Sequence, residues 1–334
     1  MVKLNKSYSK LIESIGATLQ KRRENAIQAV QRELVAANWE IGKYIVEYEQ
    51  GGNEKAEYGS SLLEWLSKDL KLHFGKGFSQ SKIYLCRKFY IEYPIFQTVS
   101  GKLSWSHYSE LLSISDLKSR TFYEQQTVNE NWSVRELKRQ IDTSLFERIA
   151  LSKDKKTVLK LSEKGQLIND AKDIIKDPYV FEFLKIPEQN IVKEKDLEAK
   201  LIENLQHFLL ELGKGFSFVA RQFKITLDNQ HFFIDLVFYH RILKCFVLID
   251  LKTKKVKHQD IGQMNLYLNY FNEEENTEGD NEPIGIIIAK EKNEFLVKYA
   301  TGGISNKIFV SKYQLYLPDK KLLEEKVNEI LDSE

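Results

Sequence analysis

The stretch "CFVLIDLKT", residues 245–253, is an apolar run with the length and composition of a buried strand, yet its end carries Asp250 and Lys252. Burying either charge without a partner costs several kcal/mol, so the pair needs a structural or functional reason. Side chains two residues apart on a strand point to the same face, which places both groups at one location near the strand's end. The stretch therefore predicts a strand that carries a charged site.

The segments around this strand predict a mixed sheet. The strand-like runs "FSFVARQFKITL" and "HFFIDLVFYH" precede it, joined by turns short enough for antiparallel hairpins. A helix over about 195–212 comes before them. After them follow a helix around "QDIGQMNLYLNYF", a strand "IGIIIA", a short helix near 292–300, a strand "KIFVSKYQLYL" and a final polar helix. The order α-β-β-β-α-β-α-β predicts an α/β domain with helices flanking the sheet over residues 178–334.

Charged residues from three of these elements are expected to converge. A hairpin brings Asp235 beside Asp250, and two carboxylates held close repel each other unless a proton or a metal intervenes. Magnesium prefers oxygen ligands and keeps several waters, so two aspartates and a main-chain carbonyl would suffice to hold it. Lys252 is then suited to orient or deprotonate a water, or to neutralise charge on a phosphate. Glu198 lies in the middle of the apolar stripe of the 195–212 helix, where facing the metal would explain a carboxylate.

The helix that follows the charged strand offers further polar groups. Gln263 and Tyr267 are four residues apart on one helix face and could orient water or touch a phosphate, although Tyr267 is more typical of core packing. Beyond Lys252, the run "KTKKVKH" contains three further lysines that form either a solvated edge or a contact with a nucleic-acid backbone: Lys254, Lys255 and Lys257. The histidines show no spacing typical of zinc ligands, so zinc is not expected.

Residues 1–150 have the patterns of an all-helical domain, and the polar stretch 151–177 is the expected linker region. Apolar residues recur at alternating spacings of three and four, the seam of a helix packed along another helix, at Ile27, Val30, Leu34, Ala37, Ile41, Tyr44 and Tyr48. An internal helix or a second subunit could be the partner, and we expect an internal one. Capping boxes predict helix starts at Ser61 and Ser133.

A segment within this domain, "SLLEWLSKDLKLHFGKGFSQSKIYLCRKFY", has the outline of a helix-turn-helix. Its second helix would offer Lys82, Arg87 and Lys88 to phosphates or base edges. An ordinary helical hairpin with a charged face has the same outline, so DNA binding by this segment is one of two interpretations.

Bulk composition narrows the class of protein. The 334 residues are 42% hydrophobic and 29% charged, as in folded globular proteins, and the net charge of +2 indicates no global field for nucleic acid. Two cysteines cannot supply a disulfide framework and fit a reducing compartment. No segment has the length of a membrane span or the apolar core of a signal peptide, so we expect a cytoplasmic protein without membrane contact.

The ordered set of motifs resembles the PD-(D/E)XK superfamily of magnesium-dependent nucleases. "RQFKITL", "IDLVFYHRILKCFVLIDLKT" and "GQMNLYLNYF" resemble, more closely, the YhcG-like nucleases, and "FSQSKIYLCRKFY", "LSWSHYSELL" and "NWSVRELKRQI" are similar to that family's helical N-terminal domain. The likeness covers nearly the whole chain. It implies an α domain followed by an α/β, restriction-endonuclease-like domain. Asp250 stands where many members have glutamate, and Leu236 replaces the usual neighbour of the first aspartate.

The resemblance also implies a reaction: hydrolysis of phosphodiester bonds in DNA with Mg²⁺, which Mn²⁺ could replace. Asp235, Asp250 and Lys252 correspond to the catalytic core, with Glu198 and Gln263 in support, and the metal would be held by Asp235, Asp250 and Glu198. Two alternatives stay open. One is a catalytically idle DNA-binding or assembly protein that retains the fold. The other is a nuclease that acts on RNA. In any of these interpretations the N-terminal helices could join two copies of the chain in a homo-oligomer.

Overall fold

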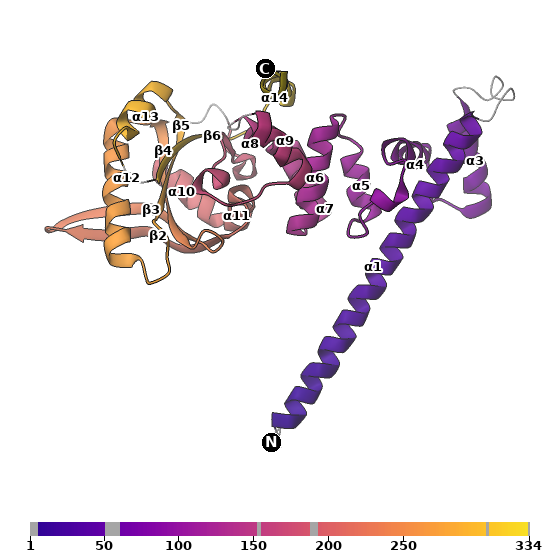
Figure 1. The fold of residues 1–334 in the computed structure, drawn as a ribbon, viewed down its shortest axis with the longest axis horizontal. Helices are drawn as coiled ribbons and strands as arrows, with labels where there is room; N and C mark the ends of the chain where they lie inside the picture. Colours follow the sequence, from indigo (N-terminus) through magenta and orange to yellow (C-terminus); the bar gives the residue numbers. More distant parts are fainter. Residues whose placement is uncertain (1–5, 51–60, 152–154, 188–192, 305–306, 333–334) are drawn as a thin grey trace. The chain divides into compact units, whose positions relative to one another are not determined.

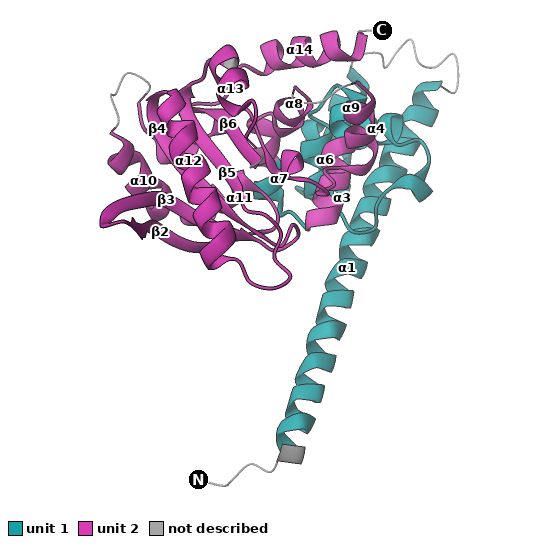
Figure 2. Ribbon diagram, turned by 60° about the vertical axis from the view of Figure 1, so that its left-hand side comes forward, with its two compact units in different colours: residues 1–120, 131–137 teal, residues 121–130, 138–334 magenta. Residues whose placement is uncertain are grey.

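The structure, a computed structural model, describes residues 6–50, 61–151, 155–187, 193–304 and 307–332 (Figure 1). Its N-terminal region is helical and its C-terminal region is a mixed sheet with helices, which confirms the predicted fold class. The chain forms two compact units: residues 1–120 with 131–137, and residues 121–130 with 138–334 (Figure 2). Part of the helical region therefore belongs to the same unit as the sheet.

The first unit consists of helices packed around a small aromatic core. It contains α1 (Lys6–Gln50), α3 (Leu62–Phe74), α4 (Gln80–Glu92), η2 (Phe96–Thr98), α5 (Trp105–Leu111) and the first residues of α6 (Leu117–Glu130) and α7 (Val134–Asp142). Phe89 of α4 and Tyr108 of α5 are fully buried, with their ring centroids 4.8 Å apart. Aromatic pairs at this separation add to the burial of their area, so they hold α4 to α5.

Helix α1 packs closely on α4 along one face. A Cβ at Gly42 would lie 2.0 Å from the carbonyl oxygen of Cys86, so only glycine allows this approach of the two backbones. The Cys86 thiol donates to Asn38 Oδ1 at 3.4 Å, and the Trp39 indole donates to the Tyr93 carbonyl at 2.7 Å. Val35, on the same face, is 2% exposed. This face, and not the predicted seam, is the internal contact of α1.

The expectation that the seam from Ile27 to Tyr48 packs inside the chain is wrong. Ile27 is 59% exposed and Tyr44 is 64% exposed, and Val30, Leu34 and Tyr48 are exposed as well. The physical reason is that α1 has two apolar faces, and the face that contains Gly42 fits α4 more closely. The 3-4 spacing correctly indicated an apolar stripe but could not identify its partner.

One of the two predicted capping boxes forms. The Ser133 N–H donates to Glu136 Oε2 at 2.6 Å, and the Glu136 N–H donates to Ser133 Oγ at 3.3 Å, as expected at the start of α7. Ser61 has helical dihedral angles and makes no side-chain cap bond, so the box predicted there is wrong. A serine that is already helical cannot aim its hydroxyl at the free N–H groups of the first turn.

The second unit is built on a six-stranded sheet with the order β1-β6-β5-β4-β3-β2. The strands are β1 (Tyr179–Val180), β2 (Phe216–Leu227), β3 (Gln230–His240), β4 (Cys245–Lys255), β5 (Ile284–Glu291) and β6 (Lys307–Gln314). Strands β2, β3 and β4 are antiparallel neighbours, whereas β4, β5, β6 and β1 are parallel. The stretch at residues 245–253 thus lies in a central strand of a mixed sheet.

Helices complete this unit. They are α8 (Leu145–Ala150), α9 (Lys155–Lys164), η3 (Ala171–Ile174), η4 (Glu182–Leu184), α10 (Glu194–Glu203), α11 (Leu205–Leu212), α12 (His258–Tyr270), η5 (Phe271–Glu275), α13 (Glu294–Thr301) and α14 (Lys320–Asp332). The helix predicted over 195–212 is two helices that meet at Asn204, and β1 was not predicted as a strand.

Two hydrophobic cores cover the two faces of the sheet. Val247, Ile249 and Leu251 of β4 share a core with α10 and α11, whereas Leu248 of β4 shares the other with α12. The alternation follows from the period of two along a strand that is buried on both faces. Asp250 and Lys252 lie two and four residues after Leu248, so their side chains point to the same face of the sheet, the α12 side.

Within the part of the chain that the structure describes, none of the helices combines the length and the apolar character of a membrane span.

Candidate active site

The candidate active site lies where β3 separates from β4. The paired part of these strands ends with Leu236 opposite Ile249, and one further step of the same register sets Asp235 against Asp250. The Leu251 N–H donates to Asp235 Oδ2 at 2.8 Å, which ties the Asp235 carboxylate to the β4 backbone. The two aspartates predicted to converge are therefore neighbours across the strand pair.

Asp250 and Lys252 form an ion pair within this site. Asp250 Oδ2 lies 2.7 Å from Lys252 Nζ, and Asp250 as a whole is only 4% exposed. Burial raises the pKa of Asp250 to about 7; Lys252 opposes this rise, and the charge of Asp235 adds to it. Burial lowers the pKa of Lys252, but attraction to Asp250 more than offsets this, so the Lys252 pKa lies above its ordinary value.

Glu198 reaches the same region from α10. It is buried, as the helical stripe predicted, and burial is the main cause that raises its pKa. Gln222 of β2 connects it to Asp235, because the Gln222 amide donates to Glu198 Oε2 at 2.6 Å and to Asp235 Oδ1 at 3.1 Å. Sequence reasoning missed Gln222. Its only signal is the polar pair "RQ" inside a strand, and its backbone adopts a positive φ of 48° that strand residues rarely take.

A pocket of about 450 Å³ opens beside these carboxylates. It is lined by Lys195, Glu198, Ala199, Arg221, Gln222 and Asp235. Arg221 is largely exposed, and its Nε lies 4.0 Å from Glu198 Oε1. The pocket therefore combines the buried carboxylate of Glu198 and the half-buried one of Asp235 with cationic groups, which could contact an anionic substrate.

Gln263 and Tyr267 form a pair on α12. The Gln263 amide donates to the Tyr267 hydroxyl, which donates in turn to the Phe233 carbonyl at 3.0 Å. Burial raises the pKa of Tyr267 to about 12, and the charge of Asp250 adds to this rise. Gln263 is exposed and bonded to a buried tyrosine, so the structure links it to the site through Tyr267.

The predicted nucleic-acid contacts differ in their surroundings. Lys254, Lys255 and Lys257 are exposed at the end of β4 and the start of α12. In the other unit, the Arg87 Nε donates to Glu49 at 2.8 Å and the Lys88 ammonium donates to the Leu112 carbonyl at 2.6 Å, which pairs both with groups of the chain. Lys82 lies 5.5 Å from the centre of the Phe78 ring and is half-buried.

The carboxylates of the candidate site supply only part of a ligand set for a hard cation such as Mg²⁺. Among the described residues, no three His, Cys, Asp or Glu side chains are grouped as a ready metal site. Glu198, Asp235 and Asp250 do not form such a group, and Gln222 bridges Glu198 and Asp235. Two neighbouring carboxylates remain, with the Asp250 pKa raised, and a bound cation would relieve their repulsion. Asp235 and Asp250 therefore fit Mg²⁺ with water completing its shell.

The sheet, the facing aspartates and the Asp-x-Lys strand define a nuclease domain of the PD-(D/E)XK type. Residues 172–328 match the YhcG PDDEXK nuclease domain, and residues 14–148 match the DUF1016 N-terminal domain. The chain is 36% identical to "Putative nuclease YhcG" of Escherichia coli (strain K12), over 95% of this chain and 92% of that protein. It belongs to the YhcG family of PDDEXK nucleases.

Solved structures resemble a smaller part of the chain. A repair endonuclease from Pyrococcus abyssi is 20% identical with a TM-score of 0.28, and the EndoMS–dsDNA complex is 14% identical with a TM-score of 0.27. Each likeness covers 40% of this chain and half of the other chain.

Proposed function

We propose that this nuclease hydrolyses phosphodiester bonds in DNA and that it requires Mg²⁺, which Mn²⁺ can replace. The observations that support this most directly are the position of Asp235 beside Asp250 and the ion pair of Asp250 with Lys252 on a buried central strand. The half-buried carboxylate of Asp235 beside this ion pair adds a further charge that raises the cost of burial, so the arrangement needs a reason beyond structure.

Each side chain has a distinct role in this proposal. Asp235 and Asp250 would hold the cation, which when bound polarises a phosphate oxygen and lowers the pKa of water. Lys252, held by Asp250, places a positive charge where negative charge develops on the phosphate. Glu198 is suited to accept a proton from water because its pKa is raised, and Gln222 fixes the orientation of Glu198. Gln263 would support the site through Tyr267.

The substrate assignment rests on the charges around the pocket. Arg221 and Lys195 line it and are exposed, and Lys254, Lys255 and Lys257 extend the cationic surface beyond β4. Such groups bind the phosphate backbone of DNA without reading its sequence. Lys82, in the helical unit, could supply a further phosphate contact. RNA carries the same phosphates and is therefore the comparison substrate.

The test is a cleavage screen with the full chain. Labelled duplex, nicked, branched and single-stranded DNA and single-stranded RNA are incubated with Mg²⁺, Mn²⁺ or a chelator, and products are separated by length. DNA cleavage should appear with either metal, vanish in chelator and be absent in Asp250→Asn. Undiminished cleavage in chelator would contradict the metal requirement, whereas cleavage of RNA alone would contradict the substrate.

A further inference from the structure

The N-terminal part of α1 has no packing partner among the described residues. Every residue from 10 to 30 is exposed, and the helix extends beyond α3, α4 and α5 (Figure 1). Most helix stability in proteins comes from the packing of an apolar face and not from intrinsic propensity. Something that covers this half of α1 would stabilise it.

The uncovered surface carries an apolar stripe, which Arg23 interrupts near its middle. Ten large apolar side chains of α1 are about half exposed: Tyr8, Leu11, Ile12, Ile15, Leu19, Ile27, Val30, Leu34, Tyr44 and Tyr48. At 100° per residue, all but Leu11 fall within a sector on the order of 120° wide, which is the width of a helix-packing face. The stripe runs along α1 on both sides of Gln28 and is separate from the face that contacts α4.

Charge separates the two halves of this helix. Residues 6–25 contain five Lys or Arg and two Glu, whereas residues 26–50 contain two Lys or Arg and four Glu. In a parallel pair of α1 helices, like charges would face each other. In an antiparallel pair, the basic half of each copy lies beside the acidic half of the other, which is the self-complementary arrangement that a two-fold interface requires.

An antiparallel pair centred on Gln28 also aligns the apolar side chains. Positions equally distant from Gln28 meet, and the pairs that form are Tyr8 with Tyr48, Ile12 with Tyr44, Ile15 with Ile41, Leu19 with Ala37 and Ala26 with Val30. One layer sets Arg22 against Leu34; such a polar member of a seam fixes the register at some cost in stability. The apolar positions before Gln28 and those after it do not continue one heptad repeat along a single helix. In the antiparallel pair, however, the positions before Gln28 of one copy lie opposite the positions after Gln28 of the other, and there the spacings match.

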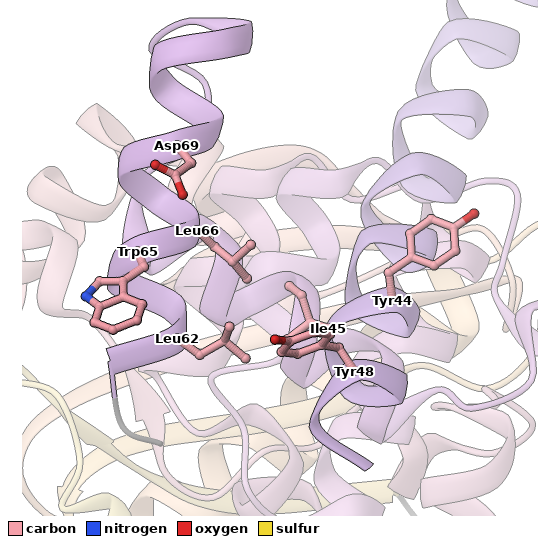
Figure 3. A pocket seen from close by; sticks show the side chains of 7 residues that line it. All are labelled: Tyr44, Ile45, Tyr48, Leu62, Trp65, Leu66 and Asp69. Atoms are coloured by element: carbon pink, nitrogen blue, oxygen red, sulfur yellow. The ribbon is translucent and has the colours of Figure 1, made fainter. Parts of the chain in front are cut away.

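A pocket lies at the end of the stripe that the partner's N-terminal residues would reach. Tyr44, Ile45 and Tyr48 of α1 and Leu62, Trp65, Leu66 and Asp69 of α3 line a volume of about 390 Å³ (Figure 3). Trp65 is 42% exposed. In the antiparallel register the partner's Tyr8 reaches Tyr48, so the partner's first turns would fill this pocket.

We propose that α1 forms an antiparallel two-helix interface with α1 of a second copy of this chain, centred on Gln28. Nine half-exposed side chains from each chain, the stripe without Leu11, bury on the order of 1,000 Å² per partner, which meets the roughly 800 Å² that a stable, specific interface buries on each side. The nuclease is then a dimer with two active sites. This inference is independent of the metal and of the substrate.

The mass of the full chain in solution tests the interface. Sedimentation equilibrium at about 10 µM should give the mass of two chains, and Leu19→Glu should weaken dimerisation on the order of 100-fold because it places two charges in the seam. Gln28→Glu introduces the same charge on the opposite face and should leave the dimer intact. Leu19 is exposed, so its replacement does not disturb the core of the monomer. A monomeric parent, or a dimer unaffected by Leu19→Glu, would overturn the proposal.

Cross-linking tests the orientation. Leu19→Cys and Ala37→Cys are prepared separately; the native Cys86 and Cys245 are buried and do not compete. Antiparallel pairing predicts a disulfide-linked dimer when the two variants are mixed and oxidised, and little when either is oxidised alone. Efficient cross-linking of Leu19→Cys with itself would indicate a parallel pair and refute the antiparallel register. Binding of a different protein's helix in place of the second copy would leave the pure chain monomeric, which also refutes it.

Discussion

Lys252 and Asp250 are in contact. Replacing each of them in turn tests whether the pair serves catalysis or only stabilises the fold. Lys252→Ala removes the ammonium that faces the developing charge, and the single-turnover cleavage rate should fall by roughly 100-fold or more, the scale of losing one electrostatic catalyst. Lys326→Ala, which replaces an exposed lysine of α14, is the matched control and should cleave at the parental rate.

Asp250→Asn tests whether this pair contributes to the stability of the folded protein. The pKa of Asp250 is raised in the folded state, so its ionisation reduces metal-free stability as pH rises from about 4 to about 7. Asparagine carries no charge and avoids that cost, so the melting temperature of Asp250→Asn near pH 8 should not fall. Its cleavage rate and its metal affinity should both fall. Thermal melts and metal titrations of both variants provide the measurement. If both variants melt lower yet cleave at the parental rate per folded molecule, then the pair is structural.

Single residues show how far sequence reasoning extends at this site. Asp235 and Asp250 could be paired in advance because hairpin register follows from short turns and strand alternation. Glu198 could be chosen because a carboxylate on an apolar helical stripe needs a partner. Gln222 could not, because its role depends on a backbone with positive φ that brings its amide between two carboxylates, and a glutamine in a strand gives no such signal.

The contact between α1 and α4 depends on one residue without a side chain. Gly42→Ala would place a methyl group 2.0 Å from the Cys86 carbonyl oxygen, and a backbone atom cannot move aside as a flexible side chain can. We expect a loss of at least about 1–3 kcal/mol of unfolding free energy, the usual cost of overpacking, despite the better helix propensity of alanine.

Gly262→Ala in α12 is the control for this change, since a Cβ there meets nothing within 4 Å. Alanine should stabilise that helix by about 0.5–1 kcal/mol relative to glycine. Urea unfolding of both variants measures the difference. Equal effects of the two substitutions would mean that α1 and α4 do not approach as closely as described.

Among the elements, those with one dominant pattern were predictable. The strands β2 to β6 follow from apolar runs between short turns, and α12 follows from its apolar face. The errors arose where local sequence leaves two solutions: α1 has two apolar faces, and the break at Asn204 and the two-residue strand β1 depend on packing against the sheet. Intrinsic propensity is weak against such tertiary contacts.

At the scale of the molecule, a buried ion cluster joins helical residues to the nuclease sheet within the second unit. Arg148 of α8 and Glu211 of α11 are fully buried, with Arg148 Nη1 2.6 Å from Glu211 Oε1. Glu211 Oε1 also accepts from the Val180 N–H of β1 at 2.9 Å, and Arg139 Nη2 donates to Glu211 Oε2 at 3.2 Å. A fragment that begins at residue 172, where the nuclease-domain match starts, would leave Glu211 without both arginines.

The buried ion cluster around Glu211 makes the stability of the second unit sensitive to acid. Burial raises the pKa of Glu211, but Arg148, Lys176 and Arg139 more than offset this and lower it to about 2. A carboxylate with a depressed folded-state pKa contributes stability above its ordinary pKa, and the contribution is lost as pH falls from about 5 to about 2. Glu211→Gln should therefore destabilise the second unit at pH 7 by about 3 kcal/mol or more, because it also leaves the buried Arg148 guanidinium without its counter-charge.

The unfolding free energy of Glu211→Gln should decrease less as pH falls than the unfolding free energy of the parent does. Urea unfolding between pH 3 and pH 7 gives the free energy of each protein, and the gap between parent and Glu211→Gln should narrow as pH falls, since protonation removes from the parent the charge that the variant already lacks. Glu203→Gln, at an exposed position at the end of α10, should follow the parent at every pH. A gap that stays constant across this range would show that Glu211 stabilises the fold by packing and not by its charge.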